Sequence, residues 1–177
     1  MLVCRHVCNA ARLALDRLTF PRRSGADVLT TLLSSRYGPQ LRRVDLRNCD
    51  ATIRSNVVVD LARRCPQLTH VQIRQTATLA HAAVLALAEA GLLKVFDVWG
   101  LIGDAAFEAI LRNCKGLETL SIKLSSLTMM PASIGDLRGL ASLCLHGSNY
   151  LTVLSERLGD LVALTTLDLS DCRGLTE

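Results

Sequence analysis

Aromatic residues are scarce in this sequence, at 3% of 177 residues, so leucine, valine and alanine must fill its core. No apolar run is long enough to cross a bilayer. The first 20 residues do not make a secretory signal, because Arg5, His6, Arg12 and Asp16 interrupt any apolar stretch. Glycine-rich phosphate loops and the His-Glu-x-x-His zinc motif are also absent. We therefore expect a chain that neither spans a membrane nor carries those two kinds of site.

Charge and cysteine usage narrow the class further. The net charge is only +4, and no aromatic stacking platform accompanies the basic residues, so specific nucleic-acid binding is not expected. Four of the seven cysteines, Cys49, Cys65, Cys114 and Cys172, recur at equivalent places in a repeat, where a thiol acts as a small hydrophobe. Regularly spaced, unpaired thiols favour a reducing compartment, which predicts a cytoplasmic or nuclear protein.

Leucine is abundant, and it recurs at a fixed spacing. The pattern Leu-x-x-(Leu/Val/Ile/Phe)-x-(Leu/Ile/Val) occurs six times, in steps of 23 to 27 residues. A fixed period of this size is typical of a solenoid. The triplets are Leu41-Val44-Leu46, Leu68-Val71-Ile73, Leu93-Phe96-Val98, Leu117-Leu120-Ile122, Leu140-Leu143-Leu145 and Leu164-Leu167-Leu169.

Each triplet predicts a short strand, because its second and third apolar residues are two positions apart and share one face. The predicted strands are 43–46, 70–73, 95–98, 119–122, 142–145 and 166–169. Alternation of these strands with helical segments gives a parallel sheet. The helices cover the face of that sheet to which the paired apolar residues point. Helices are wider than strands, so the stack curves with the strands on the inside.

Helical spacing between the strands predicts the return segments. One helix opens at Ser55-Asn56, and another is capped by Asp104. The helix between them ends at Gly91, and its predicted apolar stripe is Leu79, Ala82, Ala83, Ala86 and Leu87. Segments 131–135 and 155–159 leave room for only a turn or two, which favours 3₁₀ geometry.

The segment Leu41-x-x-Val44-x-Leu46-x-x-Cys49 resembles the leucine-rich repeat consensus, and the resemblance covers about residues 41–177. It implies a right-handed βα horseshoe segment with strands on the concave face and helices on the convex face. Thr76, Leu101 and Ser148 stand where that consensus expects Asn or Cys, which predicts altered loop geometry in the third repeat.

Two subtypes of the repeat are recognisable. Ala62-Arg63-Arg64-Cys65-Pro66-x-Leu68, echoed at 112–117, resembles the cysteine-containing subtype of F-box proteins. The stretch 130–140, Met-Pro-x-x-Ile-Gly-x-Leu-x-x-Leu, resembles the subtype of plant resistance proteins and bacterial effectors.

The two ends of the chain give separate expectations. We assign 1–40 to an N-terminal helical cap and 41–177 to about six repeats, the last incomplete. Within the cap, 2–15 is similar to the last helix of an F-box, although the earlier helices that contact a Skp-type adaptor are missing; the alternative is a plain amphipathic helix. A helix over 25–36 then leads to the first strand. At the other end, the strand at 164–169 is predicted to leave an open edge and partly exposed leucines.

The concave face supplies the candidate binding residues. The residues between the paired apolar positions are Asp45, Gln72, Asp97, Ser121, Cys144 and Asp168, and those after the second apolar position are Arg47, Arg74, Trp99, Lys123, His146 and Ser170. Stacking of the strands aligns each set into a column. The second column is mainly basic with one central Trp, and Trp and Arg are enriched at interface hot spots. We predict that Arg47, Arg74, Trp99, Lys123 and His146, with Asp45, Gln72 and Asp97 beside them, bind an acidic or phosphorylated protein segment; the alternative is a solvated face.

Two other clusters are weak candidates for a metal site or a catalytic triad. Cys4, His6 and Cys8 lack a fourth metal ligand, and His6 faces away from the two cysteines on a helix. His146, Ser148 and Asp168 or Asp171 lack a nucleophile elbow and an oxyanion device. We expect no catalytic residue, cofactor or metal.

Three functional readings remain open. The resemblance favours a protein-interaction scaffold, specifically the substrate-recognition part of an SCF-type ubiquitin ligase. A second reading is a ligand-sensing repeat segment of an immune-receptor-like or effector protein. A third is the repeat region of a larger enzyme whose catalytic domain lies elsewhere.

Overall fold

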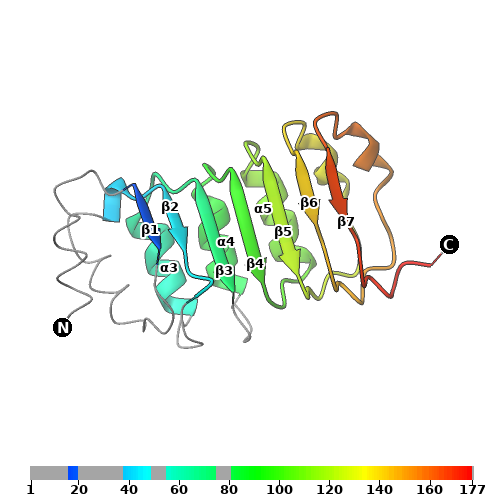
Figure 1. Cartoon of the computed structure of the whole chain (residues 1–177), viewed down its shortest axis with the longest axis horizontal. Helices are drawn as coiled ribbons and strands as arrows, with labels where there is room; N and C mark the ends of the chain where they lie inside the picture. The colour runs from blue at the N-terminus through cyan, green and yellow to red at the C-terminus, as the bar shows by residue number, and fades with distance from the viewer. Residues whose placement is uncertain (1–15, 20–37, 49–54, 75–80, 177) are drawn as a thin grey trace.

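The computed structural model describes residues 16–19, 38–48, 55–74 and 81–176. Its seven strands form one parallel sheet in which every strand lies beside the next strand in the sequence. The helices of the described residues lie behind the sheet, so this part of the chain forms an elongated solenoid with a strand face and a helix face (Figure 1). The predicted α/β solenoid is confirmed. The strands are β1 (Arg17–Thr19), β2 (Arg43–Asp45), β3 (His70–Arg74), β4 (Val95–Trp99), β5 (Thr119–Lys123), β6 (Ser142–Cys144) and β7 (Thr166–Asp168).

The register of the sheet follows the leucine triplets. The second apolar residue of each triplet pairs with its equivalent on the next strand, from Val44 and Val71 through to Leu143 and Leu167. These positions are buried from Val44 to Leu143, because the helices cover that side of the sheet. The six predicted strands are thus confirmed, with bounds that differ by one residue.

Strand β1 was not predicted. It pairs in parallel with β2 and buries Leu18 against Val44. The sequence around it reads Leu15-x-x-Leu18-x-Phe20, which matches the triplet except that Phe stands at the last apolar position. The sheet therefore starts inside the segment 1–40 that we assigned to a helical cap. The F-box-like segment 2–15 and the predicted helix 25–36 lie outside the described residues, and η1 (Gly38–Gln40) is a 3₁₀ turn.

Within the described residues, three α-helices return the chain behind the first half of the sheet: α3 (Ser55–Arg64), α4 (His81–Glu89) and α5 (Asp104–Asn113). Helix α3 starts as predicted. Helix α4 is rotated relative to the predicted stripe, because Ala82 is exposed and Val84 is buried in its place. Valine removes more apolar surface from water than alanine does, so the face with Val84 packs inward. None of the helices in the described residues is long and apolar enough to cross a membrane.

Asp104 does not cap α5, which corrects the sequence prediction. The N-cap is Gly103 and makes no side-chain hydrogen bond. The Asp104 carboxylate instead accepts hydrogen bonds from the Thr128 backbone N–H at 2.9 Å and the Thr128 hydroxyl at 2.5 Å. Asp104 therefore joins two consecutive repeats, because its side chain finds two donors in the next loop.

The later repeats return through 3₁₀ helices, η2 (Ala132–Asp136) and η3 (Glu156–Asp160), as predicted. Ahead of them, Met129 and Val153 form an isolated parallel bridge. The third repeat departs from the others as expected. Leu101 is 52% exposed, and Ile102, one residue later, takes the buried place.

Strand β7 is the last strand of the sheet, and no described strand pairs with its outer edge. Leu167 is 43% exposed there, whereas the equivalent Leu143 is buried. Leu164 and Leu169 are only partly buried against the core. This agrees with the predicted open edge, since each repeat of a solenoid is covered by its neighbour.

Candidate protein-binding face

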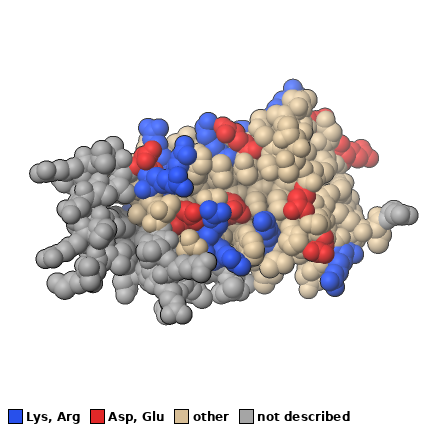
Figure 2. All heavy atoms as spheres, viewed as in Figure 1, with Lys and Arg blue, Asp and Glu red and all other residues tan. Residues whose placement is uncertain are grey.

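The strand face is the side of the molecule that the helices leave open. Lys and Arg side chains gather over its N-terminal half, with acidic side chains among them, and its C-terminal half is less charged (Figure 2). The pairing of the strands aligns Asp45, Gln72, Asp97, Ser121, Cys144 and Asp168 into one column, as predicted. Arg74, Trp99 and Lys123 are aligned in the second column.

Trp99 lies between two cations at the end of β4. The guanidinium carbon of Arg74 is 4.4 Å from the centre of the Trp99 ring system, and Lys123 Nζ is 5.0 Å from it. The negative face of the aromatic ring attracts both charges. Neither Arg74 nor Lys123 forms an ion pair within the described residues. Trp99 is only partly buried, so the three side chains present a fixed basic and aromatic surface.

Among the described residues, Arg47, unlike Arg74 and Lys123, is already paired with an acidic residue of the chain. Its Nε donates to Asp45 Oδ1 at 3.0 Å and its terminal nitrogen donates to Asp45 Oδ2 at 2.8 Å. This fork-shaped pair holds the pKa of Asp45 below its usual value and raises that of Arg47. The two charges offset each other, so the predicted site loses one of its cations.

His146 is likewise directed toward the last repeat. Its Nδ1 lies 2.8 Å from Ser170 Oγ, and its Nε2 lies 3.7 Å from a carboxylate oxygen of Asp171. Ser170 in turn donates its hydroxyl to Asp168 at 2.5 Å, and Cys144 donates its thiol to the same carboxylate at 3.3 Å. Donors from Ser170 lower the pKa of Asp168 to about 2. The His146 backbone carbonyl accepts a hydrogen bond from the Leu124 N–H at 2.9 Å, so His146 lies beside the Lys123 end of β5, but its ring is engaged by the last repeat.

Asp97 is the acidic residue of the face that lacks local donors. Its Oδ1 is buried and has no hydrogen-bond partner within the described residues. Gln72 and Ser121 are its partners in the strand register. A buried carboxylate oxygen without a donor is costly, so this atom is suited to a donor from a bound partner.

Two exposed leucines lie at the same end of the strands as Trp99. Leu124 follows Lys123 directly and is 51% exposed, and Leu101 follows Trp99 by two residues. Leu124 also has φ of 58°, in the left-handed region that costs a leucine about 1–2 kcal/mol. Strained backbone and an exposed leucine at one position are both unfavourable in the free chain. They therefore mark this edge as a candidate contact surface.

Sequence reasoning missed one part of the face. It considered the residues between and after the paired apolar positions and passed over the residue before them. That position holds Arg17, Arg43 and His70 on β1, β2 and β3, which pair directly. They line a cavity of about 100 Å³ together with Val44, Asp45 and Gln72.

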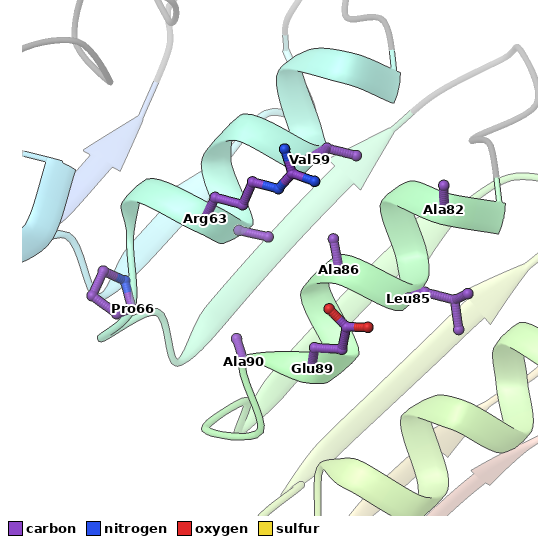
Figure 3. Close-up of a pocket in the computed structure, with 9 residues that line it drawn as sticks. Val59, Arg63, Pro66, Ala82, Leu85, Ala86, Glu89 and Ala90 are labelled. Carbon is purple, nitrogen blue, oxygen red and sulfur yellow. The ribbon is translucent and has the colours of Figure 1, made fainter.

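The helix face carries a larger but simpler groove. It lies between α3 and α4 and has a volume of about 490 Å³. Small side chains of α4 face Val59 and Arg63 of α3 across it (Figure 3). Its lining is mostly apolar, with Arg63 and Glu89 as the charged groups, so it has few polar groups to orient a ligand.

Comparison with known proteins decides the fold. No family model matches the chain, and no curated protein matches it. Among solved structures, it is similar to a leucine-rich repeat protein of Leptospira interrogans (TM-score 0.55, 20% identity, covering 87% of this chain and 42% of that one). It is also similar to an internalin of Listeria monocytogenes (TM-score 0.52, 19% identity, covering 82% and 38%). The chain has the leucine-rich repeat fold.

A third similar structure is the leucine-rich repeat ectodomain of the Arabidopsis thaliana membrane receptor kinase GASSHO1/SCHENGEN3, in complex with CASPARIAN STRIP INTEGRITY FACTOR 2. Its TM-score is 0.55 and its identity 18%, covering 85% of this chain and 20% of that one. The present chain spans less than half the length of each of these three leucine-rich repeat chains.

The structure also bears on the hydrolase-like group and the metal cluster considered from the sequence. Ser148 is buried and hydrogen-bonds to Ser125, so it does not meet His146. Ser170 meets His146, but it gives its proton to Asp168, which leaves no activated nucleophile. The described residues hold no group of three metal-ligating side chains, and Cys4, His6 and Cys8 lie outside them.

Proposed function

We propose that this chain is a non-enzymatic interaction scaffold whose strand face binds an acidic or phosphorylated protein segment at Arg74, Trp99 and Lys123. The position of Trp99 between two cations carries the proposal. A guanidinium held over an aromatic ring, as that of Arg74 is over Trp99, keeps N–H groups for a carboxylate or phosphate. A pre-oriented side chain loses less conformational entropy on binding, so this arrangement favours affinity.

The surroundings of Trp99 support a protein partner. Leu101 and Leu124 add exposed apolar surface beside the charges, and the unpaired Asp97 oxygen offers an acceptor for a backbone N–H. A mixture of aromatic, apolar and charged groups is typical of the centre of a protein interface. Arg47 and His146 then lie at the rim, since each already has acidic or hydroxyl partners within the chain.

The specific role that we propose is substrate recognition for an SCF-type ubiquitin ligase in the cytoplasm or nucleus. The support is the cysteine-type repeat signature, whose Cys65 and Cys114 are fully buried at equivalent positions. Contact with a Skp-type adaptor would depend on residues 2–15, which lie outside the described residues. A second candidate is a ligand-sensing repeat segment, which the switch from α-helices to the 3₁₀ helices η2 and η3 favours.

Affinity purification from cell extract, followed by mass spectrometry, tests these roles. We expect W99A and R74E to lose the partners that the wild-type chain retains. Y150A and R138E are the matched controls, because Tyr150 is a more exposed aromatic residue and Arg138 an exposed cation outside the candidate site. Equal recovery with W99A and wild type would contradict the proposed face. Adaptor and cullin subunits among the partners would support the ligase role, and a nucleotide-binding receptor would support the sensing role.

A further inference from the structure

The first three strands carry a second basic cluster, separate from Trp99. Arg17, Arg43 and His70 are direct neighbours in the register of β1, β2 and β3. Like charges directly opposite each other on neighbouring strands destabilise a sheet. Neither arginine forms an ion pair within the described residues, so this repulsion is relieved there only by longer-range attraction, such as that between Arg17 and Asp45.

The cluster surrounds a small hollow. Arg17, Arg43 and His70 line the cavity of about 100 Å³, with Val44, Asp45 and Gln72 completing the lining. Asp45 offsets only part of this basic charge, because its carboxylate is paired with Arg47 and attracts Arg17 without forming an ion pair with it. Pockets for whole small molecules measure roughly 300–1,000 Å³, so this cavity suits one chemical group of a larger partner.

Hydrogen bonding fixes the tautomer of His70. The Thr69 hydroxyl donates its only proton to the Arg42 carbonyl at 3.0 Å. Thr69 Oγ1 and His70 Nδ1 are also 2.8 Å apart. Because the hydroxyl proton is already used, Nδ1–H must be the donor of this second hydrogen bond. Neutral His70 therefore carries its proton on Nδ1 and a lone pair on Nε2. An anion is repelled by that lone pair and attracted once Nε2 is protonated.

We propose that Arg17, Arg43 and His70 bind the phosphoryl group of a phosphorylated protein segment. The assignment rests on the proposed protein-binding role of the strand face and extends it to a second anion site. Two guanidinium groups and an imidazolium are suited to a phosphate dianion. His70 begins β3 and Arg74 ends it, so the two sites are roughly 13 Å apart, or about four residues of extended chain.

Binding at this site takes up a proton. Burial, together with the charges of Arg43, Lys94 and Arg17, lowers the pKa of His70, while Glu118, which pairs with Lys94 at 2.7 Å, raises it. A bound dianion stabilises the imidazolium and raises this pKa again. Affinity should therefore increase as the pH falls from 8 toward 6.5. It should decrease below about 6, where the phosphate becomes a monoanion.

The first experiment uses inorganic phosphate as the probe and follows the imidazole signals by NMR. We expect phosphate to raise the pKa of His70 relative to chloride at the same ionic strength, with His81 on α4 as an internal control. R43Q and R17Q should remove this effect while keeping the circular dichroism spectrum, and R74Q should retain it. The same His70 pKa in phosphate and chloride, or an undiminished effect in R43Q, would overturn the site.

The second experiment identifies the source of the phosphoryl group. Immobilised peptides with one phosphoserine between degenerate positions are compared with the unphosphorylated pool. We expect wild type to bind the phosphorylated pool at least tenfold more tightly and R43Q to lose this preference. Equal binding of both pools, or displacement by a mixed-sequence 5′-phosphorylated oligonucleotide at equal phosphate concentration, would overturn the assignment to a protein segment. Failure of the W99A test alone would leave the His70 response to phosphate intact, which separates the two proposals.

Discussion

The hydroxyl oxygens of Ser125 and Ser148 lie 2.5 Å apart inside the core and join two consecutive repeats by a hydrogen bond. The two residues are only 2% and 0% exposed. They occupy the position that Cys172 holds in the last repeat, where its thiol donates to the Leu145 carbonyl at 3.1 Å. None of these three residues is the asparagine of the consensus. Each one nevertheless forms a hydrogen bond with the neighbouring repeat, so its buried polar side chain has a partner.

Removing one of these hydroxyls should destabilise the solenoid. S148A leaves Ser125 Oγ without this partner, at a cost of about 1–3 kcal/mol for a buried polar group. The double variant S125A/S148A should cost less than the two single variants together, because it leaves no orphaned hydroxyl. Urea unfolding of the four proteins measures this, with S142A on the open strand face as the control. Strictly additive costs would show that the hydrogen bond contributes nothing.

Leu124 should be a position where substitution stabilises the chain. Its φ is 58°, and the equivalent residues in the next two repeats, Gly147 and Asp171, are also left-handed, with φ of 72° and 57°. Asparagine tolerates this conformation better than leucine does, so L124N should raise the free energy of unfolding by about 1 kcal/mol.

The control for L124N is L101N, which removes an equally exposed leucine where φ is not positive. Thermal unfolding compares the two variants with wild type. An equal gain in both would attribute the effect to lost apolar surface rather than to backbone strain. If L124N is more stable but binds partners less well, the strain is retained for binding, in line with the proposed face.

The sequence predicted the repeat architecture well because one spacing rule governs every strand. Strand positions, their parallel order and the 3₁₀ returns all follow from apolar residues at fixed intervals. The rule missed β1 because Phe20 stands where the pattern required Leu, Ile or Val. It misplaced the buried face of α4 because a short, alanine-rich helix has a weak apolar stripe.

The candidate site was less predictable, because alignment in a column does not reveal side-chain pairing. Arg47 and Arg74 hold equivalent positions, yet Arg47 is paired with Asp45 and Arg74 stacks on Trp99. The difference arises from position 45, which is Asp in one repeat and corresponds to Gln72 in the next. His70 was overlooked because its significance depends on Arg43 and Arg17, which come from two other repeats.

Asp168 should make stability depend on pH in the acid range. Hydrogen bonds from Ser170 lower its pKa to about 2 from 3.8. A carboxyl group with a lowered pKa stabilises the fold above its unfolded-state pKa, and this contribution is lost as the pH falls toward about 2. The gap in urea midpoint between wild type and D168N should therefore be largest above pH 4 and close toward pH 2. A gap that is constant with pH would show that the carboxylate charge is not responsible; D60N on α3 is the control.

The buried thiols should report on unfolding of the solenoid. Cys65 and Cys114 are fully buried, and burial raises the pKa of each to about 11. Only the thiolate reacts with iodoacetamide, so both should react near pH 8 only when the chain opens. Cys144, which is partly exposed on the strand face, should react before Cys65 and Cys114. Urea should accelerate the reaction of Cys65 and Cys114 in step with loss of helical circular dichroism. Peptide mapping by mass spectrometry separates the cysteines.

Alkylation of Cys114 faster than global unfolding would mean that the helix face opens locally, and that α5 does not fold and unfold as one unit with the sheet.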